Sequence, residues 1–387
     1  MFLLWCAGLG AAAQFAKFSI TLGDVAQRYP GAQIDVSLVL SIIGVVGIFF
    51  GAVAGVMVER AGFRKVLIFA LILGAILSTL QAAIPPLSIM LGSRVLEGVS
   101  HLGIVIAAPT LMALLSAPRH RPIVMGIWAS FFGISYALTG WLGVPLLQTW
   151  GLRAVFLAHA VFMAELAVRM VIFLPAGVGM DSNDQTKKPR LTWKSWFGVH
   201  RETYSQLRVS LPGISFLWLT LMFIALLTFL PNFAEPDQRP LLIVIMPLAS
   251  IVGTLAAGFV AQRVSPAVPG AIGFATVVVL ITVMWTFLDV YPQFYGGLAI
   301  AMMMGSGAVQ GAVFALVPAL NFDAASQARA NGAVAQLGNL GTAIGTPLFA
   351  LALGVAGFAG LAGTTIVLSL AGVATLLFVI LGQVGRR

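Results

Sequence analysis

Three ionisable side chains lie at helical spacing within an apolar stretch of the chain. Arg94, Glu97 and His101 are three and four residues apart, so on a helix they share one face. Charges inside lipid are costly, which makes each of them a functional candidate. Burial disfavours an ionised carboxylate while a nearby arginine favours it, and a proton carrier needs such a balance. The pattern predicts proton coupling through Glu97 beside Arg94, with His101 as a candidate proton relay. The alternatives are a permanent Arg94–Glu97 pair and a histidine that only forms hydrogen bonds.

A second polar stripe precedes this one. Gln14, Lys17 and Thr21 are also three and four residues apart in an apolar segment. A buried ammonium needs a partner or water, so we expect Lys17 to face a wet cavity or to pair with Glu97; reaching the outer surface is the alternative. In a shared cavity, Lys17, Arg94 and Glu97 would carry an ionised charge of +1. This charge favours an anionic or carboxylate-bearing substrate, with Gln14, Lys17 and Arg94 among its contacts.

Aromatic and amide side chains complete the predicted substrate site. Trp128 and Tyr136 are candidates for an apolar wall of the cavity, and simple packing is the alternative. The second half of the chain carries amides in place of charges, and Gln310, Gln336 and Asn339 are candidates to recognise polar groups. Amides also join helices to one another, so both interpretations stay open. His159, Glu165 and Arg169, in the apolar segment 153–175, are expected to have structural roles.

The composition is that of a polytopic membrane protein. Of the 387 residues, 60% are hydrophobic and 9% are charged, and the mean hydropathy is +1.02. A spanning helix needs about 20 apolar residues, and twelve such segments can be placed. They cover 2–25, 35–58, 64–84, 87–116, 121–148, 153–175, 209–231, 240–262, 267–288, 293–319, 326–353 and 358–383. With a single cysteine there is no disulfide framework, and neither a metal site nor another cofactor is expected.

The basic residues orient these segments in the membrane. With the N-terminus inside, three basic residues (Arg28, Arg153 and Arg239) face outward and fifteen lie on the cytoplasmic side. The positive-inside rule therefore predicts that both termini are cytoplasmic. The fifteen are Arg60, Arg64, Lys65, Arg119, Arg121, Lys187, Lys188, Arg190, Lys194, Arg201, Arg208, Arg263, Arg329, Arg386 and Arg387. The charge of +9 thus reports orientation, and no nucleic-acid partner is expected.

The segment 176–208 is polar and divides the twelve spans into six and six. The chain is therefore predicted to have an N-terminal bundle (1–175), a cytoplasmic linker (176–208) and a C-terminal bundle (209–387). The second part of the linker mixes aromatic and basic residues, which is typical of a helix lying at the lipid surface; a solvated linker is the alternative. The short outer loops lack an Asn-x-Ser/Thr sequon, which suits a bacterial inner membrane.

One loop carries a recognisable motif. In the segment 55–65, Gly55, Glu59, Arg60 and Gly62 are followed by Arg64 and Lys65. The segment resembles the loop between helices two and three of major facilitator superfamily transporters, G-x-x-x-D-[RK]-x-G-[RK]-[RK], with Glu59 in place of Asp and Phe63 in place of a basic residue. Likewise, Arg94-x-x-Glu97-Gly98 is similar to the fourth-helix motif R-x-x-Q-G of that superfamily.

The two halves of the chain also resemble each other in this motif. Gly55, Glu59 and Arg60 recur as Gly258, Gln262 and Arg263, each 203 residues further on. Such duplication is typical of two six-helix repeats. The resemblance implies an all-α fold of twelve transmembrane helices in two bundles around a cavity. It also implies a cytoplasmic gate whose charge pairs break during transport. The gate residues would be Gly55, Glu59, Arg60, Gly62, Arg64 and Lys65. The alternative is that they only set orientation.

These observations predict a secondary active transporter that works by alternating access. The favoured function is proton-coupled uptake of a small anionic or carboxylate-bearing metabolite. The alternatives are proton-driven export of amphipathic, drug-like compounds and a non-transporting receptor on the same fold. No nucleophile–base set or phosphate loop occurs, so an enzyme is not expected. The expected partners are a small-molecule substrate and the lipid bilayer, with the proton as coupling ion and a monomer as the assembly.

Overall fold

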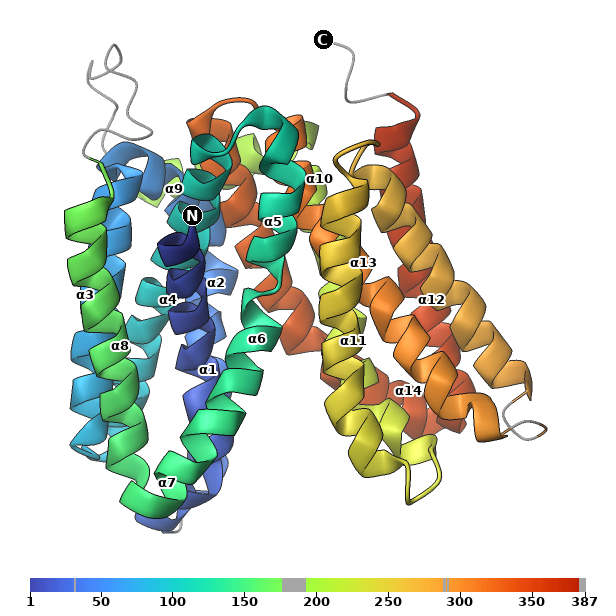
Figure 1. Ribbon diagram of the computed structural model, residues 1–387, viewed down its shortest axis with the longest axis horizontal. Coiled ribbons are helices and arrows are strands. Elements are labelled where there is room, and N and C mark those ends of the chain that lie inside the picture. The colour runs from blue at the N-terminus through green and yellow to red at the C-terminus, as the bar shows by residue number, and fades with distance from the viewer. Residues whose placement is uncertain (31–32, 176–192, 288–289, 291, 383–387) are drawn as a thin grey trace. The chain divides into compact units, whose positions relative to one another are not determined.

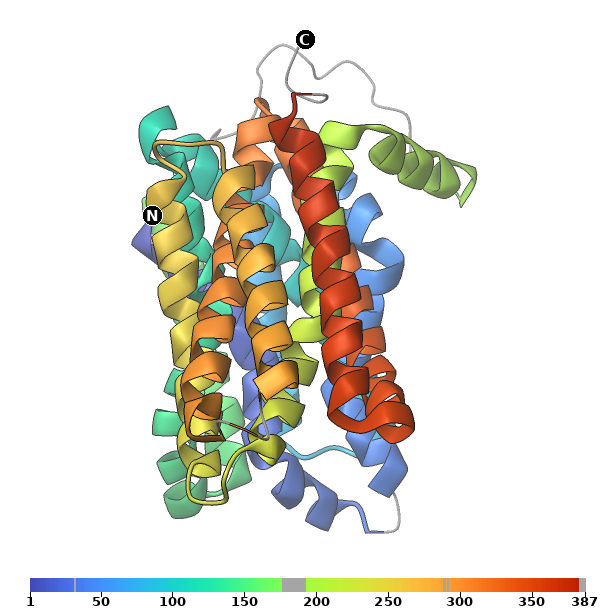
Figure 2. The same ribbon diagram turned by 90° about the vertical axis from the view of Figure 1, so that its right-hand side faces the viewer.

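The computed structural model describes residues 1–387 except 31–32, 176–192, 288–289, 291 and 383–387. Within the described residues the chain is all-helical and has no strand (Figure 1). Eleven of the described helices are long and apolar enough to cross a membrane. The last of them, α14, is two helices in sequence, because Ala356 and Gly357 have non-helical backbone angles and the chain reverses direction there (Figure 2). Separating 324–355 from 358–380 gives twelve candidate spans.

The helix ends lie within a few residues of the predicted ends. The helices of the first half are α1 (Phe2–Arg28), α2 (Gln33–Ala61), α3 (Phe63–Ala82), α4 (Leu87–Leu115), α5 (Arg121–Ala129), α6 (Phe131–Leu138), α7 (Val144–Trp150) and α8 (Leu152–Phe173). Those of the second half are α9 (Trp193–Ser205), α10 (Leu207–Phe229), α11 (Arg239–Val260), α12 (Ala267–Phe287), α13 (Tyr295–Leu320) and α14 (Ala324–Ile380).

The fifth predicted span is not one continuous helix. It is divided into α5, α6 and α7, and a π-helical turn, Thr139–Gly143, separates α6 from α7. Pro145 lies in the first turn of α7. Proline lacks a backbone N–H and cannot donate to the preceding turn, so the regular hydrogen-bond ladder is interrupted just before it. The hydropathy of 121–148 predicted the span but not this interruption.

The contacts divide the chain into two compact units. Unit 1 comprises Met1–Leu115, Phe131–Thr203 and Asp323–Gln336, and unit 2 comprises Ser116–Ser130, Tyr204–Phe322 and Leu337–Arg387. Each unit thus includes a short segment from the other half of the sequence. The division into 1–175, 176–208 and 209–387 stays a prediction. The part of that linker at 176–192 lies outside the described residues, and the part at 193–205 forms α9.

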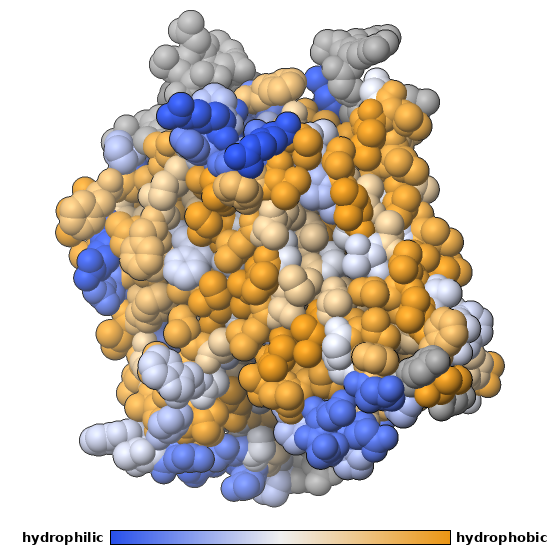
Figure 3. Space-filling view, turned by 45° about the vertical axis from the view of Figure 1, so that its right-hand side comes forward, coloured by the Kyte–Doolittle hydropathy of each residue, from blue (hydrophilic) through white to orange (hydrophobic). Residues whose placement is uncertain are grey.

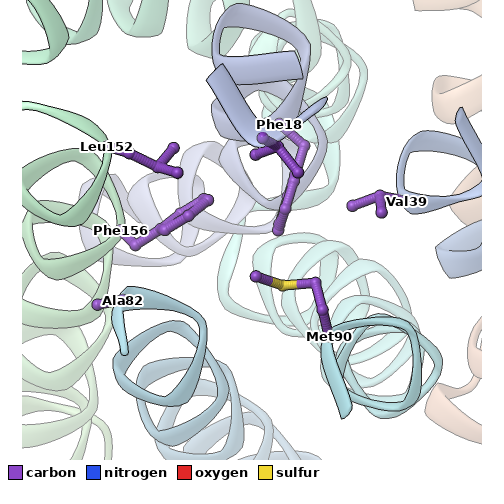
Figure 4. Close-up of a cluster of buried hydrophobic side chains, with 7 residues drawn as sticks. Phe18, Val39, Ala82, Met90, Leu152 and Phe156 are labelled. Carbon is purple, nitrogen blue, oxygen red and sulfur yellow. The ribbon is translucent and has the colours of Figure 1, made fainter. Parts of the chain in front are cut away.

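Unit 1 is built around α1, which packs against α4, α6 and α8, while α3 packs against α4 and α8. One of its apolar clusters joins α1, α2, α4 and α8 through Phe18, Val39, Met90 and Phe156 (Figure 4). Gly98 lets α2 approach α4, because a Cβ there would lie 2.6 Å from the carbonyl oxygen of Ile43. Small residues at such crossings are typical of membrane helices.

Unit 2 is built around α13, which packs against α10, α11, α12 and α5. Helices α5 and α11 approach closely at two glycines, since a Cβ on Gly258 would lie 3.0 Å from the Cα of Gly126. On the face shown in Figure 3, hydrophobic side chains cover most of the middle, and hydrophilic ones gather towards the upper and lower edges and in one patch at the left edge. This distribution is the one expected for helices that cross a bilayer.

The start of α14 is capped by Asp323. Its Oδ1 accepts from the backbone N–H of Ser326 at 2.8 Å, and its Oδ2 accepts from the Ser326 hydroxyl at 2.7 Å. Burial alone would raise the pKa of Asp323, but the hydrogen bonds from Ser326 outweigh it and lower that pKa below its usual value. The carboxylate therefore stays ionised and caps the helix at all physiological pH values.

We predict that Asp323→Ala lowers the free energy of unfolding by about 0.5–2 kcal/mol, the usual contribution of an N-cap. Asp323→Asn is the matched control, because asparagine also caps helices. Thermal unfolding of the purified protein at pH 5 and pH 8 measures both variants. Because the folded-state pKa is depressed, the contribution is lost only below this range, so the deficit of Asp323→Ala should be equal at the two values. A deficit as large in Asp323→Asn would contradict the capping role.

Candidate functional site

The centre of the candidate site is the carboxylate of Glu97, which lies between two cations in unit 1. Lys17 on α1 places its Nζ atom 2.6 Å from Oε1 of Glu97. Arg94, one turn earlier on α4, pairs with Oε2 of the same carboxylate. None of the three side chains is more than 1% exposed. Lys17 therefore pairs with Glu97, which is one of the arrangements predicted for it. Its side chain is buried and does not reach the outer surface.

The ammonium of Lys17 is fully occupied by acceptors. Besides Glu97, it donates to Oγ of Ser78 at 2.6 Å and to Oε1 of Gln81 at 2.8 Å, both on α3. Gln81 in turn donates to Oε2 of Glu97 at 2.8 Å. Nδ1 of His159 also lies 3.4 Å from Nζ. An ammonium has three N–H donors, and the three shorter contacts use all of them. The charge is thus held in one position by helices α3 and α4.

Arg94 anchors the same site to α1 and α2. Its Nε donates to the carbonyl oxygen of Val39 at 2.8 Å, and its Nη1 donates to that of Gln14 at 2.9 Å. The guanidinium lies over the ring of Phe18, with Cζ 4.3 Å from the ring centroid. Its Nη2 is buried and has no hydrogen-bond partner among the described residues. The Gln14 side chain donates to Ser100 at 2.8 Å, and its Oε1 is likewise buried without a described partner.

His159 on α8 extends the network by one hydrogen bond. Its Nδ1 lies 2.6 Å from Oγ of Ser78, and its Nε2 lies 3.0 Å from the carbonyl oxygen of Gly10. A carbonyl oxygen can only accept, so the Nε2 atom carries a proton. Ser78 accepts from Lys17 and can therefore donate its hydroxyl proton to Nδ1 of a neutral His159. Neither Ser78 nor Gln81 was predicted from the sequence, although two polar residues three apart in the apolar α3 were a usable signal.

The other predicted first-half residues lie outside this network. Nδ1 of His101 lies 3.1 Å from the carbonyl oxygen of Ala11, and its ring meets that of Phe15 edge-on. Tyr136 on α6 is 37% exposed. Trp128 belongs to unit 2 and is fully buried there, so its ring offers no exposed surface in this conformation.

Two of the three predicted substrate amides bind backbone carbonyls. Gln310 on α13 donates to the carbonyl oxygen of Ala129 at 2.8 Å in unit 2. Gln336 on α14 donates to that of Ile48 at 2.6 Å in unit 1. Asn339 is partly buried and lies in unit 2. In this conformation Gln310 and Gln336 join helices from opposite halves of the sequence, which is the structural alternative considered for them.

The motif glycines meet two different geometric requirements. A Cβ on Gly55 would lie 2.6 Å from the carbonyl oxygen of Ala328, so glycine allows α2 to contact the start of α14. Gly62 has a φ of 91° at the turn between α2 and α3, a conformation that favours glycine. Both positions therefore need the residue that the motif supplies.

The charged residues of the motif form two kinds of contact. Glu59 lies 3.4 Å from Nε of Arg329 on α14, whose Nη1 also lies 2.7 Å from Glu202 on α9. Arg64 donates to the carbonyl oxygens of Val171 and Leu174, each at 2.8 Å. It thereby satisfies acceptors at the C-terminal end of α8, where a cation is also favoured by the helix dipole. Arg60 and Lys65 are exposed. From the sequence, Arg329 is expected only among the cytoplasmic basic residues, and its pairing with Glu59 is not predicted.

Comparison with known proteins identifies the family. Residues 2–346 match the family model of the Major Facilitator Superfamily, and the chain belongs to this superfamily. The class of protein is therefore a multi-pass membrane transporter, in agreement with the helices that can cross a bilayer. No protein with a curated description matches the sequence.

Solved structures of the same fold cover nearly the whole chain. The crystal structure of the human organic anion transporter MFSD10 has a TM-score of 0.75 at 18% identity, covering 97% of this chain and 98% of that one. The proton:xylose symporter XylE has a TM-score of 0.76 at 14% identity, covering 98% and 94%. The E. coli fucose:proton symporter FucP has a TM-score of 0.74 at 12% identity, covering 98% and 97%. At these identities the likeness shows the fold alone.

The charges of the site predict an order of stability among variants. Lys17, Arg94 and Glu97 together carry +1 when ionised; Glu97→Gln raises this to +2, and adding Lys17→Met returns it to +1. Removing one partner of a buried ion pair costs about 3–5 kcal/mol. We expect Glu97→Gln to have the lowest melting temperature in detergent and the double variant to regain part of the loss. A Glu97→Gln protein as stable as the wild type would show that the pairs contribute nothing.

Proposed function

We propose that this protein is a proton-coupled transporter that takes up a small anionic or carboxylate-bearing metabolite by alternating access. One observation carries the proposal: a carboxylate and two cations lie fully buried inside membrane-spanning helices, with a net ionised charge of +1. Ionisable residues at such a depth are costly and are typically functional. The proton is the coupling ion, and Glu97 with Arg94 is the coupling site.

The buried cluster acts on the substrate through its electric field. Lys17 and Arg94 are at most 1% exposed, so they do not touch a ligand in this conformation. A charge in a low-dielectric interior acts over a longer range than one in water, and a field of this sign attracts an anion. The names of the similar structures support the same combination, since two are called proton symporters and one an organic anion transporter.

The same proposal assigns a gate to the contact between α2 and the start of α14. Glu59 and Glu202 both pair with Arg329 there, and Gln336 ties the same segment to Ile48. Alternating access requires two arrangements of such an element. In one arrangement, these contacts hold Asp323–Gln336 against α2. In the other arrangement, α14 is separated from α2. By the positive-inside rule, the basic residues of the loops support a cytoplasmic position for this gate, and the membrane that we propose is a bacterial inner membrane.

Export of amphipathic compounds is the second candidate function. The partly exposed aromatic residues Phe132 and Tyr136, whose rings stack with centroids 4.9 Å apart, favour it. An exporter of this kind would be indifferent to Lys17. Uptake of an anion would depend on the charge of the cluster.

The coupling is tested with protein reconstituted in liposomes. Currents on a solid-supported membrane are recorded for small carboxylates, with and without a pH gradient. We expect the gradient to drive transport in the wild type, and Glu97→Gln to abolish this drive while sparing substrate exchange. Exchange also reports that the variant is folded, and Glu97→Asp, which keeps a titratable group, should retain the drive. If currents appear only with lipophilic neutral or cationic compounds and Lys17→Ala leaves them unchanged, the proposed uptake is wrong and export is the function.

The gate is tested by the accessibility of Thr110, which is fully buried and bonds to Asn331 of α14 at 3.0 Å. Thr110→Cys is made in a Cys6→Ala background, because Cys6 is the only native cysteine. Partly exposed ion pairs each stabilise by about 0.2–1 kcal/mol. Removing two of them with Arg329→Ala should therefore speed thiol labelling by about 2- to 30-fold. Arg153→Ala, an exposed arginine on α8, is the control; equal rates in both variants would refute the gate.

A further inference from the structure

Four aromatic rings form a continuous row on unit 1. Phe15 on α1 meets His101 on α4 edge-on, with centroids 5.1 Å apart, and approaches Phe132 on α6 at 6.1 Å. Phe132 stacks on Tyr136 at 4.9 Å with an interplanar angle of 29°. We call these four residues the ring row. None of them is buried, and Tyr136 is the most exposed.

The ring row is suited to water and ligand rather than to lipid. Two of its members, His101 and Tyr136, carry polar groups within membrane-spanning helices, where a lipid-facing position would be costly. The carbonyl oxygen of Ala11, 3.1 Å from Nδ1 of His101, requires a proton on that atom. In a neutral imidazole this leaves Nε2 as an acceptor. The row thus combines ring faces with a hydroxyl and a ring nitrogen.

The row also lies within the field of the buried ion cluster. Phe15 follows Gln14, whose carbonyl oxygen accepts from Arg94 at 2.9 Å, and His101 lies one helical turn after Glu97 on α4. The cluster carries a net charge of +1 and has no exposed surface of its own. An anion attracted by this charge therefore cannot contact the cluster itself in this conformation, whereas the rings are at least partly exposed.

We infer that the ring row binds the aromatic ring of a small organic carboxylate. The ligand ring lies against Phe132 and Phe15, and its carboxylate accepts a hydrogen bond from the Tyr136 hydroxyl. Aromatic rings attract one another in offset and edge-on arrangements beyond the effect of buried area. A saturated ring of the same size and charge lacks this contribution. The inference rests on the proposed uptake of carboxylates and names their class.

The test compares two probes that differ only in their ring: benzoate and cyclohexanecarboxylate. Full-length protein in liposomes is titrated with each on a solid-supported membrane. We expect half-maximal current at a benzoate concentration about 2- to 10-fold lower than for cyclohexanecarboxylate. Phe132→Leu keeps an apolar side chain but removes the ring, so the preference should fall to about one. Phe69→Leu, at a position 59% exposed on α3, is the matched control and should keep the preference.

Each outcome decides between the inference and the proposal beneath it. Equal responses to both probes in the wild type, or an equal loss of both in Phe132→Leu, would overturn the role of the rings and leave carboxylate uptake standing. No current with benzoate, cyclohexanecarboxylate or acetate would overturn both. Phe15→Leu serves as the second ring variant if Phe132→Leu does not fold. Tyr136→Phe should weaken both probes alike, since it removes the hydroxyl but keeps the ring.

Discussion

A single carboxylate, shared by two buried cations, holds unit 1 together at its polar centre. Glu97 brings Lys17 of α1 and Arg94 of α4 to the same point, and their remaining donors reach α2 and α3. Five helices, including α8 through His159, therefore meet at one group. Such an arrangement is stable only while every charge keeps its partner. Glu97 contacts α1, α3 and α4 directly, and it is linked to α2 through Arg94 and to α8 through Ser78.

Glycines supply the complementary constraint at the helix crossings. Gly55 of α2 lies against Ala328 of α14 in unit 1, and Gly258 of α11 lies against Gly126 of α5 in unit 2. Gly55 and Gly258 are the repeated positions of the sequence motif, 203 residues apart. Each copy thus performs the same task of admitting a helix from the other half of the chain. Only the first copy has an acid at the next position of the motif, Glu59, and only there does a described ion pair accompany the crossing.

Local sequence patterns predicted what depends on local chemistry. Hydropathy located the twelve spans, and spacing placed Arg94 and Glu97 on one face, because both follow from the bilayer and the helix period. The motif has a glycine at Gly62, and the structure shows why: the backbone there has a positive φ. The pairing of Lys17 with Ser78 and Gln81, and that of Glu59 with Arg329, joins residues far apart in the chain, so no periodicity could reveal it. Gln310 and Gln336 show the same limit, since an amide looks alike whether it binds a ligand or a neighbouring carbonyl.

The exchange of segments between the two units has a consequence for biosynthesis. Unit 1 contains Asp323–Gln336, which leaves the ribosome more than a hundred residues after Thr203. Until then, the strip of α2 around Gly51 and Gly55 lacks the helix that covers it. Domains generally fold in the order in which they are made. Here, however, unit 1 is completed only when most of unit 2 has been synthesised. Until Asp323–Gln336 has been synthesised, the surface of α2 that this segment contacts in the folded protein therefore lacks that contact.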